Sequence, residues 1–460
     1  MKHASVPCPT VGVPLAEILG PLSHALDLTE GQPAGHCVRC CYIGTRIGDA
    51  IGMAPAELDD LFYTLLLKDL GCSSNAARIC QIYLADDIRF KRDFKTIDGS
   101  LSSALRFVFA KTGLKENLSD RIRAIVHILQ NGGEIVDDLI ETRCHRGADI
   151  ARRLRFTASV QDGIRSLDEH WNGTGRPEGL RGEAIPLAAR IALLAQVVDI
   201  FHTGHGRDAA VAEIARRSGG WFDPALAQVF LRLATDPGFW ADLSDPELET
   251  LMLSRSAALK RRTVDADFLD DVAAAFSDVV DAKSSFTADH SNRVTLYSDL
   301  IAEEMGYAPD RRRWLRRAAL LHDLGKLGVS NQILDKPGKL DADDWHAIKG
   351  HPGAGGDILS RIPVFADIGP IARYHHERLD GGGYPDGLTA DRLPLEVRIV
   401  SVADVFDALS AERPYRAAMP IETVFGILDK DTGTAFDADC VAALRSAMGR
   451  LQSDGRTPGA

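Results

Sequence analysis

The chain has 460 residues, of which 45% are hydrophobic and 26% are charged, and its formal net charge is -12. A chain of this length predicts roughly two to four domains, and the composition excludes a collagen-like, disordered or disulfide-rich protein. The negative net charge disfavours sequence-independent binding to nucleic-acid phosphates. We therefore expect a folded globular protein and no nucleic-acid polymer as a partner.

Membrane and export signals are weak. No run reaches the ~18 apolar residues of a membrane helix, and the N-terminus lacks the apolar core of a signal peptide. Eight cysteines are too sparse for a disulfide framework, so we predict a cytoplasmic protein with free thiols and no membrane association. The run Cys37, Cys40 and Cys41 has no second ligand pair of the kind that structural zinc needs, which favours buried thiols over a zinc site.

The first half of the chain aligns with the second half in two blocks. Residues 36–71 match residues 290–325, and residues 172–199 match residues 380–407. Such an internal repeat indicates duplicated units, so we predict two tandem domains, at residues 1–250 and 255–455, divided by a polar segment near residue 255. The first copy carries additional residues at roughly 73–142, which we expect to form helices of their own.

Helical periodicity dominates the second half. Apolar positions three or four residues apart predict helices at 294–305, 314–321, 368–375 and 397–409. Alternating strand patterns are scarce, so the fold class is predicted to be all-α. We interpret the basic run at residues 311–317 as a helical face in solvent, or one that attracts an anionic substrate, rather than as a nucleic-acid patch.

The residues best suited to chemistry are grouped in the second half. They are His290, His322, Asp323, His351, His375, His376 and Asp404. Imidazole and carboxylate ligands suit Fe, Mn, Zn, Ni or Co rather than a thiolate-selective ion. Because one catalytic ion generally takes three protein ligands, this set predicts two divalent ions about 3.5–4 Å apart, the arrangement that activates a bridging hydroxide for phosphoester hydrolysis. Lys326, three residues after Asp323 and one turn along the same helical face, could orient the nucleophile or neutralise phosphate.

These residues also carry a family resemblance. The strings HDLGK and HHERLDGGGYPDG, the helix bearing Asp404 and the RPYR at residues 413–416 together resemble the HD-GYP subgroup of the HD metal-dependent phosphohydrolases over residues 265–450. The resemblance implies two HD-type helical bundles in tandem and a cyclic dinucleotide substrate. It also implies that the His and Asp set ligates metal and that Lys326 and Asp323 act in catalysis.

Further roles follow from the resemblance alone. Arg413 and Arg416 match cations that hold substrate phosphate, and Arg378 is a weaker candidate for the same role. Tyr384, in the glycine-rich loop, is expected at the rim of the site or in contact with diguanylate cyclase (GGDEF) domains. Members of the family with three metals have a Glu where this chain has Phe286, which predicts a two-metal site and a linear dinucleotide product.

The first copy has lost most of the corresponding ligands. Lys68, Cys72, Leu167, Asp168 and Gln196 stand where the second copy has His322, Lys326, His375, His376 and Asp404. His36, Asp69 and His145 keep ligand character, and an ammonium at position 68 would occupy and repel a cation site. We therefore predict a degenerate HD-GYP-like domain with a structural role, including packing or homodimerisation, or a regulatory one.

The leading hypothesis is a metal-dependent phosphodiesterase that converts cyclic di-GMP to the linear dinucleotide pGpG. Two alternatives stay open. One is hydrolysis of the mixed cyclic dinucleotide cyclic GMP-AMP, since no residue in the sequence indicates which base is recognised. The other is a non-catalytic sensor or scaffold that docks a cyclase through the Tyr384 loop.

Overall fold

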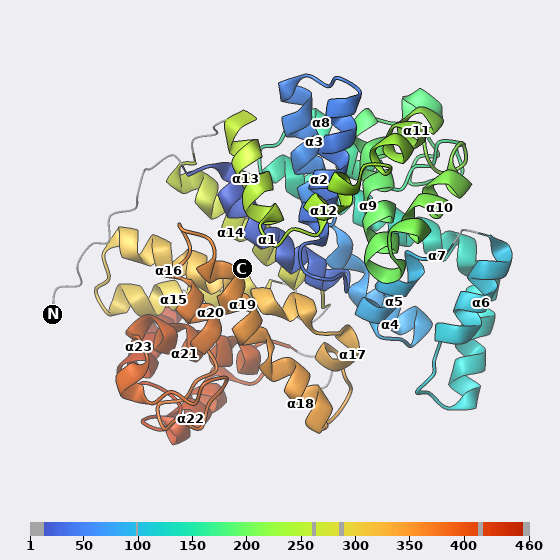
Figure 1. The fold of residues 1–460 in the computed structure, drawn as a ribbon. Helices are drawn as coiled ribbons and strands as arrows, with labels where there is room; N and C mark the ends of the chain where they lie inside the picture. Colours follow the sequence, from blue (N-terminus) through green and yellow to red (C-terminus); the bar gives the residue numbers. More distant parts are fainter. Residues whose placement is uncertain (1–12, 98–99, 260–263, 285–288, 413–416, 454–460) are drawn as a thin grey trace. The chain divides into compact units, whose positions relative to one another are not determined.

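The computed structural model of the protein describes residues 13–97, 100–259, 264–284, 289–412 and 417–453. Regular structure in these residues is helical (Figure 1), and strand-like pairing is limited to isolated bridges such as that between Asp380 and Thr389. The predicted all-α class is confirmed.

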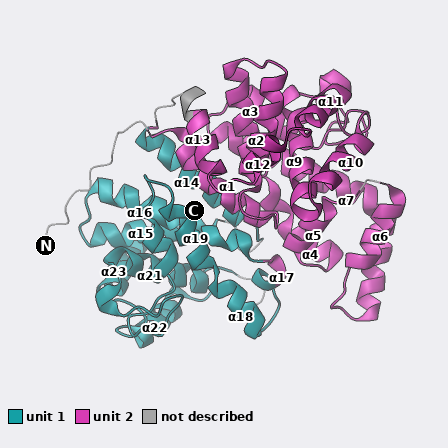
Figure 2. Cartoon of the chain, viewed as in Figure 1, with its two compact units in different colours: residues 1–11, 265–329, 333–460 teal, residues 12–264, 330–332 magenta. Residues whose placement is uncertain are grey.

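The chain divides into two compact units (Figure 2). The C-terminal unit contains residues 265–329 and 333–460, and the N-terminal unit contains residues 12–264 and 330–332. Each unit has its own buried apolar core, as expected of domains of this size.

The C-terminal unit is built around α15, which packs against α16, α21 and α23. Its helices are α14 (Ala266–Asp281), α15 (His290–Glu304), α16 (Pro309–Leu321), η3 (Leu324–Gly328), α18 (Ala342–Lys349), α19 (His351–Ser360), α20 (Gly369–Tyr374), η4 (Ala390–Arg392), α21 (Leu395–Ser410), α22 (Ile421–Asp431) and α23 (Ala438–Ser453), with α17 (Asn331–Leu334) at the boundary of the units. Several of these helices begin or end beside the residues that the sequence singles out, so helix termini rather than helix interiors deliver most of them.

The basic run on α16 is paired with carboxylates of the same unit. Arg312 contacts Asp299 at 2.7 Å, and Arg317 contacts Asp270 at 2.5 Å. Arg311 bonds Glu396 at 2.7 Å. These arginines therefore join α16 to its neighbours, which leaves fewer free cations for a polyanion than the bare sequence suggests.

The N-terminal unit is also helical, and in it α2 packs against α3 and α9. Its helices are α1 (Leu15–Thr29), α2 (His36–Ala50), α3 (Pro55–Leu67), η1 (Cys72–Asn75), α4 (Ala76–Tyr83), α5 (Asp87–Phe94), α6 (Leu101–Lys111), α7 (Leu118–Arg153), α8 (Ala158–Arg165), η2 (Gly182–Ala184), α9 (Leu187–His205), α10 (Arg207–Arg217), α11 (Pro224–Leu233), α12 (Pro237–Leu243) and α13 (Leu248–Leu259). By length and composition α9 could cross a membrane, but 67% of its apolar window is buried inside the protein. Its apolarity is accounted for by its place in the core of the unit.

Helices α4 to α6 and the first half of α7 fall in the segment that has no aligned counterpart in the second half of the chain. They form a small core of their own from buried side chains, namely Ile79, Tyr83, Phe90, Phe107, Ile128 and Ile135. The described residues of this segment are therefore largely helical, as predicted.

The cysteines of α2 are buried. Cys37, Cys40 and Cys41 are free thiols with no accessible surface. Burial raises the pKa of all three thiols, which keeps them protonated and poorly suited to hold zinc.

Candidate metal centre

The predicted ligands of the C-terminal unit lie together. His290 is the first residue of α15, His351 is the first residue of α19, and His322 and His375 cap the C-terminal ends of α16 and α20. One group consists of His290, His322 and Asp404, and the other of Asp323, His351, His375 and His376, with ligand atoms within 4.8 Å of one another in each group. Helices far apart in the sequence thus bring all of these side chains to one place.

Hydrogen bonds fix how the imidazoles point. The Nδ1 atoms of His322, His351 and His375 lie 2.7, 2.6 and 2.8 Å from backbone carbonyl oxygens of the preceding turn. Each ring therefore donates from Nδ1 and presents the lone pair of Nε2 to the interior of the site. This is the second-layer bonding that sets the tautomer of metal-bound histidines.

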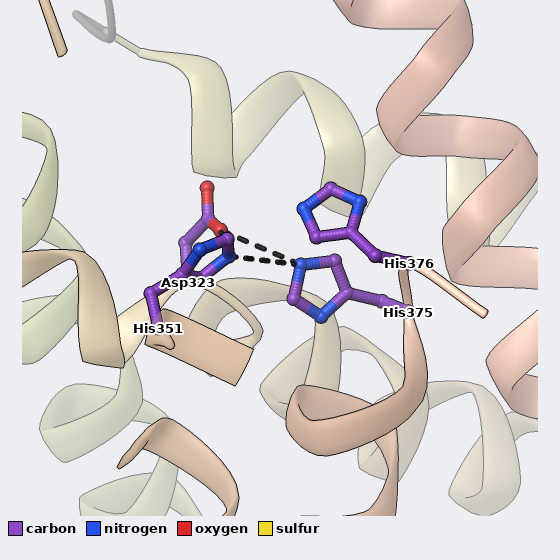
Figure 3. A group of neighbouring side chains, drawn as sticks. All are labelled: Asp323, His351, His375 and His376. Atoms are coloured by element: carbon purple, nitrogen blue, oxygen red, sulfur yellow. Dashed lines mark hydrogen bonds and ion pairs between the residues drawn. The ribbon is translucent and has the colours of Figure 1, made fainter. Parts of the chain in front are cut away.

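Asp323 belongs to the second group but also faces the first. Each of its two carboxylate oxygens is directed at a different group. Oδ2 is 3.4 Å from Nε2 of His290 and 3.3 Å from Nε2 of His322. Oδ1 is 3.3 Å from Nε2 of His351 and 3.6 Å from Nε2 of His375; Figure 3 shows Asp323 beside these two rings. This is the geometry of a carboxylate able to bridge two cations.

The donor atoms fit divalent cations. Nε2 of His290, Nε2 of His322 and Oδ1 of Asp323 are buried without a hydrogen-bond partner, an arrangement that is costly unless another group satisfies them. One cation held by His290 and His322 and a second held beside Oδ1 of Asp323 would satisfy all three atoms. The buried His and Asp clusters are thus consistent with a divalent-metal site of the HD type.

Most of the resolved pKa shifts favour the same conclusion. The exception is His290: burial alone would lower its pKa, but Asp323, Asp404 and Asp407 raise it well above its ordinary value. Burial lowers the pKa of His351 to about 4, and burial together with His375 lowers the pKa of His376 well below its usual value. Burial alone would raise the pKa of Asp323, but the neighbouring His322 and Lys326 hold it well below its ordinary value. Neutral imidazoles and ionised carboxylates are the forms that bind metal.

Lys326 reaches the site from η3. The sequence predicts it one helical turn beyond Asp323, but α16 ends at Leu321 and the turn that follows is a 3-10 helix. Since residues three apart eclipse in a 3-10 helix, Nζ of Lys326 still lies 2.5 Å from Oδ2 of Asp323. Close packing fixes this turn, because a Cβ on Gly325 would lie 2.0 Å from the carbonyl oxygen of His351.

Two carboxylates at the site were not singled out from the sequence. Asp407 accepts from Nδ1 of His290 at 2.7 Å and from Arg293 at 2.6 Å. Glu377 accepts backbone N–H groups of the glycine-rich loop, from Asp386 at 2.7 Å and from Leu388 at 3.0 Å. The spacing of Asp404 and Asp407, three residues apart on one helix, was a usable signal for the first, whereas Glu377 gave none beyond its place beside the His pair.

The remaining candidates lie at the rim or outside the described residues. Arg378 is at the surface, where it bonds Asp380 at 2.9 Å. The ring of Tyr384 packs on His376 with centroids 4.9 Å apart, which places it beside the cluster. The residues of 413–416, which include Arg413 and Arg416, and the position of Phe286 lie outside the described residues.

The aligned cluster of the N-terminal unit holds ammonium groups. Nζ of Lys68 lies 3.0 Å from Nε2 of His36 and bonds Asp69. Nζ of Lys95 lies 2.5 Å from Glu30 and 3.8 Å from Asp69. Two cations of the chain itself thus surround Asp69.

Other positions that the sequence aligns with the second half also differ from it. Gln196, aligned with Asp404, lies 3.4 Å from Nζ of Lys95. Asp168 bonds Arg143, and the side chain of His145 is 47% exposed at the surface. The N-terminal unit nevertheless has a counterpart of Asp407. Asp199 accepts from Nδ1 of His36 at 2.6 Å and from Arg39 at 2.6 Å.

Comparisons with known proteins point to one family. The HD domain family matches residues 124–226 and 274–440 of the chain. The chain is 50% identical to the 3'3'-cGAMP-specific phosphodiesterase 3 of Vibrio cholerae serotype O1 over 96% of both proteins. It is also 40% identical over 38% of its length to the cyclic di-GMP phosphodiesterase response regulator RpfG of Xanthomonas campestris pv. campestris, of which it covers 46%.

A solved structure covers nearly the whole chain. The crystal structure of a cyclic GMP-AMP specific phosphodiesterase of V. cholerae (V-cGAP3) matches 96% of this chain and 99% of its own, with a TM-score of 0.67 and 46% sequence identity. The similarity therefore extends over both units rather than the C-terminal unit alone.

Proposed function

Because the chain belongs to the HD domain family of phosphohydrolases, related to the HD-GYP cyclic dinucleotide phosphodiesterases, we propose that it hydrolyses 3'3'-cyclic GMP-AMP. The chain is a cyclic-dinucleotide phosphodiesterase; the proposal concerns its preferred substrate and the roles of its residues. The mixed dinucleotide is favoured because the relative that matches both units, at 50% identity, is specific for it. The alternative from the sequence is therefore better supported than cyclic di-GMP, its leading hypothesis.

The observation that carries the catalytic part of the proposal is the position of Asp323 between two ligand groups. His290, His322 and Asp404 would hold one divalent ion, and His351, His375 and His376 the other, with one oxygen of Asp323 directed to each. Two such ions supply Lewis acidity and lower the pKa of bound water. Fe and Mn suit this nitrogen and oxygen set, and Ni, Zn and Co are also compatible with it.

The chain's own residues position the reaction. Lys326 places a partly exposed ammonium against Asp323, where it can orient the attacking water or neutralise a phosphate oxygen. Arg413 and Arg416 are proposed to clamp the phosphate, since a guanidinium binds phosphate oxygens bidentately and keeps its charge. Arg378 is proposed as a further phosphate contact and would have to exchange Asp380 for substrate.

Hydrolysis of one ester bond gives a linear product. The oxygen of water joins phosphorus, one P–O ester bond breaks, and the departing sugar oxygen takes a proton. A linear dinucleotide is proposed as the main product, because the phenyl ring of Phe286 cannot supply the ligand that a third ion requires.

We propose that the N-terminal unit is a degenerate copy of the domain that forms the C-terminal unit. The matching helices α2 and α15, α3 and α16, and α9 and α21, together with the shared pairs of His36 with Asp199 and His290 with Asp407, support this interpretation. Its ammonium-filled cluster favours a structural or regulatory role over hydrolysis.

The test measures turnover of 3'3'-cyclic GMP-AMP and cyclic di-GMP side by side on metal-replete full-length protein. We expect faster turnover of the mixed dinucleotide, and a preference for cyclic di-GMP would contradict the substrate proposal. Asp323→Asn is nearly isosteric but lacks the negative charge, so it should lose bound metal and more than about 1000-fold in rate. Undiminished turnover in a folded Asp323→Asn variant would remove the catalytic assignment.

A further inference from the structure

The extra helices of the N-terminal unit expose an apolar stripe. Leu118, Ile122, Val126 and Leu129, all on α7, expose 71%, 52%, 45% and 48% of their surface. Isolated exposed apolar residues are ordinary, but a contiguous set on one helix is characteristic of an interaction surface. The stripe lies in the N-terminal half of α7 (Leu118–Arg153), the helix labelled α7 in Figure 1.

This stripe is distinct from the face of α7 that packs on its own unit. Ile125, Ile128 and Ile135 of the same helix are buried, so the inward face already has its partners. Three more exposed apolar residues lie on or beside α6, namely Leu101 at 77%, Phe109 at 50% and Leu114 at 61%. The chain therefore retains large apolar side chains that its own core does not use.

The spacing of the stripe is that of a helix-pairing seam. Ile122, Val126, Leu129 and Gly133 are separated by four, three and four residues, the alternation of a and d positions in a coiled coil. A Cβ built on Gly132 or Gly133 has nothing within 4 Å. Glycines with open space on this face would let a second helix approach closely.

The charges beside the seam change sign along α7. Arg123 lies toward the N-terminal end, and Glu134 and Asp137 lie toward the C-terminal end. Arg123 and Asp137 already pair with Asp120 and Arg176 at exposed sites, where such pairs contribute little. In an antiparallel arrangement Arg123 of each helix would face the acidic half of the other.

We propose that this stripe is the interface of a two-fold homodimer in which α7 of one copy lies antiparallel to α7 of a second. A two-fold axis requires a self-complementary surface, and the reversal of charge along one helix provides it. The acidic half of the seam disfavours an anionic membrane as the occupant, since surface-bound amphipathic helices are rich in Lys and Arg.

The experiment measures the mass of the full-length protein by sedimentation and light scattering across micromolar concentrations. We expect a dimer for the native chain. Leu129→Glu places a carboxylate in the seam of both copies and should raise the dissociation constant at least about 30-fold. His127→Glu adds the same group to the polar side of that helix and should leave the dimer intact.

A charge reversal tests the antiparallel direction. Arg123→Glu should weaken the dimer, and Arg123→Glu combined with Asp137→Arg should restore it, because both residues are e positions beside the seam, and e positions of two helices meet only in an antiparallel pair. Unchanged circular dichroism and thermal midpoints would show that these exposed substitutions leave the fold intact. A native monomer, a dimer that survives Leu129→Glu, or a monomer that instead binds phospholipid vesicles would each overturn the proposal.

Discussion

The two units handle a buried aspartate in the same position in different ways. Asp323 lies among imidazoles whose Nε2 atoms are 3.3 to 3.6 Å from its oxygens, and two of them, Nε2 of His290 and of His322, have no hydrogen-bond partner. Asp69 is surrounded by the ammonium groups of Lys68 and Lys95. One cluster thus has donor atoms that divalent cations from solution would satisfy, and the other already contains cations of the chain itself.

In both clusters the first histidine is held by an aspartate that is itself bonded to an arginine. Asp407 and Arg293 orient His290 as Asp199 and Arg39 orient His36, with nearly equal distances. The same arrangement of Asp and Arg therefore orients an imidazole in both units, although the surrounding side chains differ. Whether such a site can bind metal depends on the few side chains at its centre, because an ammonium repels a second cation at short range.

The largest effect on stability is expected from Lys68→Met. This change removes an ammonium that is fully buried against Asp69 and leaves that carboxylate with only the more distant ammonium of Lys95 at 3.8 Å. Breaking a buried pair in this way costs up to about 3–5 kcal/mol. Urea unfolding of the full-length protein should show the loss in the N-terminal unit, with metal content unchanged. Lys68→Met combined with Asp69→Asn removes both charges and should recover most of the stability. A loss of bound metal in Lys68→Met would break the comparison.

A smaller effect, on metal affinity, should distinguish Asp407 from its counterpart Asp199. Asp407→Asn deprives His290 of its orienting carboxylate, and changes of this kind lower metal affinity by roughly 10–100-fold. The matched change Asp199→Asn, at the corresponding position of the N-terminal unit, should leave metal affinity as it was. Titration of the metal-depleted protein with Mn²⁺ measures both variants, and equal losses would mean that the N-terminal cluster also binds metal.

The smallest effect is expected from Arg378→Ala. Its ion pair with Asp380 is exposed, so the free energy of unfolding should change by less than about 1 kcal/mol. If the guanidinium holds substrate phosphate, KM should rise several-fold while kcat changes little. An unchanged KM would restrict the phosphate-binding cations to those closer to the metal ligands.

The sequence determined more of the site than of its surroundings. Adjacent pairs such as His322-Asp323 and His375-His376 are conspicuous in a helical sequence, and the structure brings both pairs into the cluster with His290, His351 and Asp404. The helices that end at these two pairs, α16 and α20, were predicted from their apolar periodicity. By contrast, Asp407 and Glu377 look like ordinary solvated carboxylates in the sequence, and only packing gives them buried partners.

Tertiary structure decided which groups meet across long separations. Asp407 reaches His290 because α21 packs on α15, and Lys95 reaches Asp69 from the segment of the N-terminal unit that has no aligned counterpart. No local pattern encodes such pairings, since they follow from how helices dock and not from their periodicity. The sequence alone thus fixed helix type and the chemical identity of the ligands, both of which are local properties. Packing settled the direction of each donor atom and the charge that surrounds it, because these depend on contacts between residues distant in the chain.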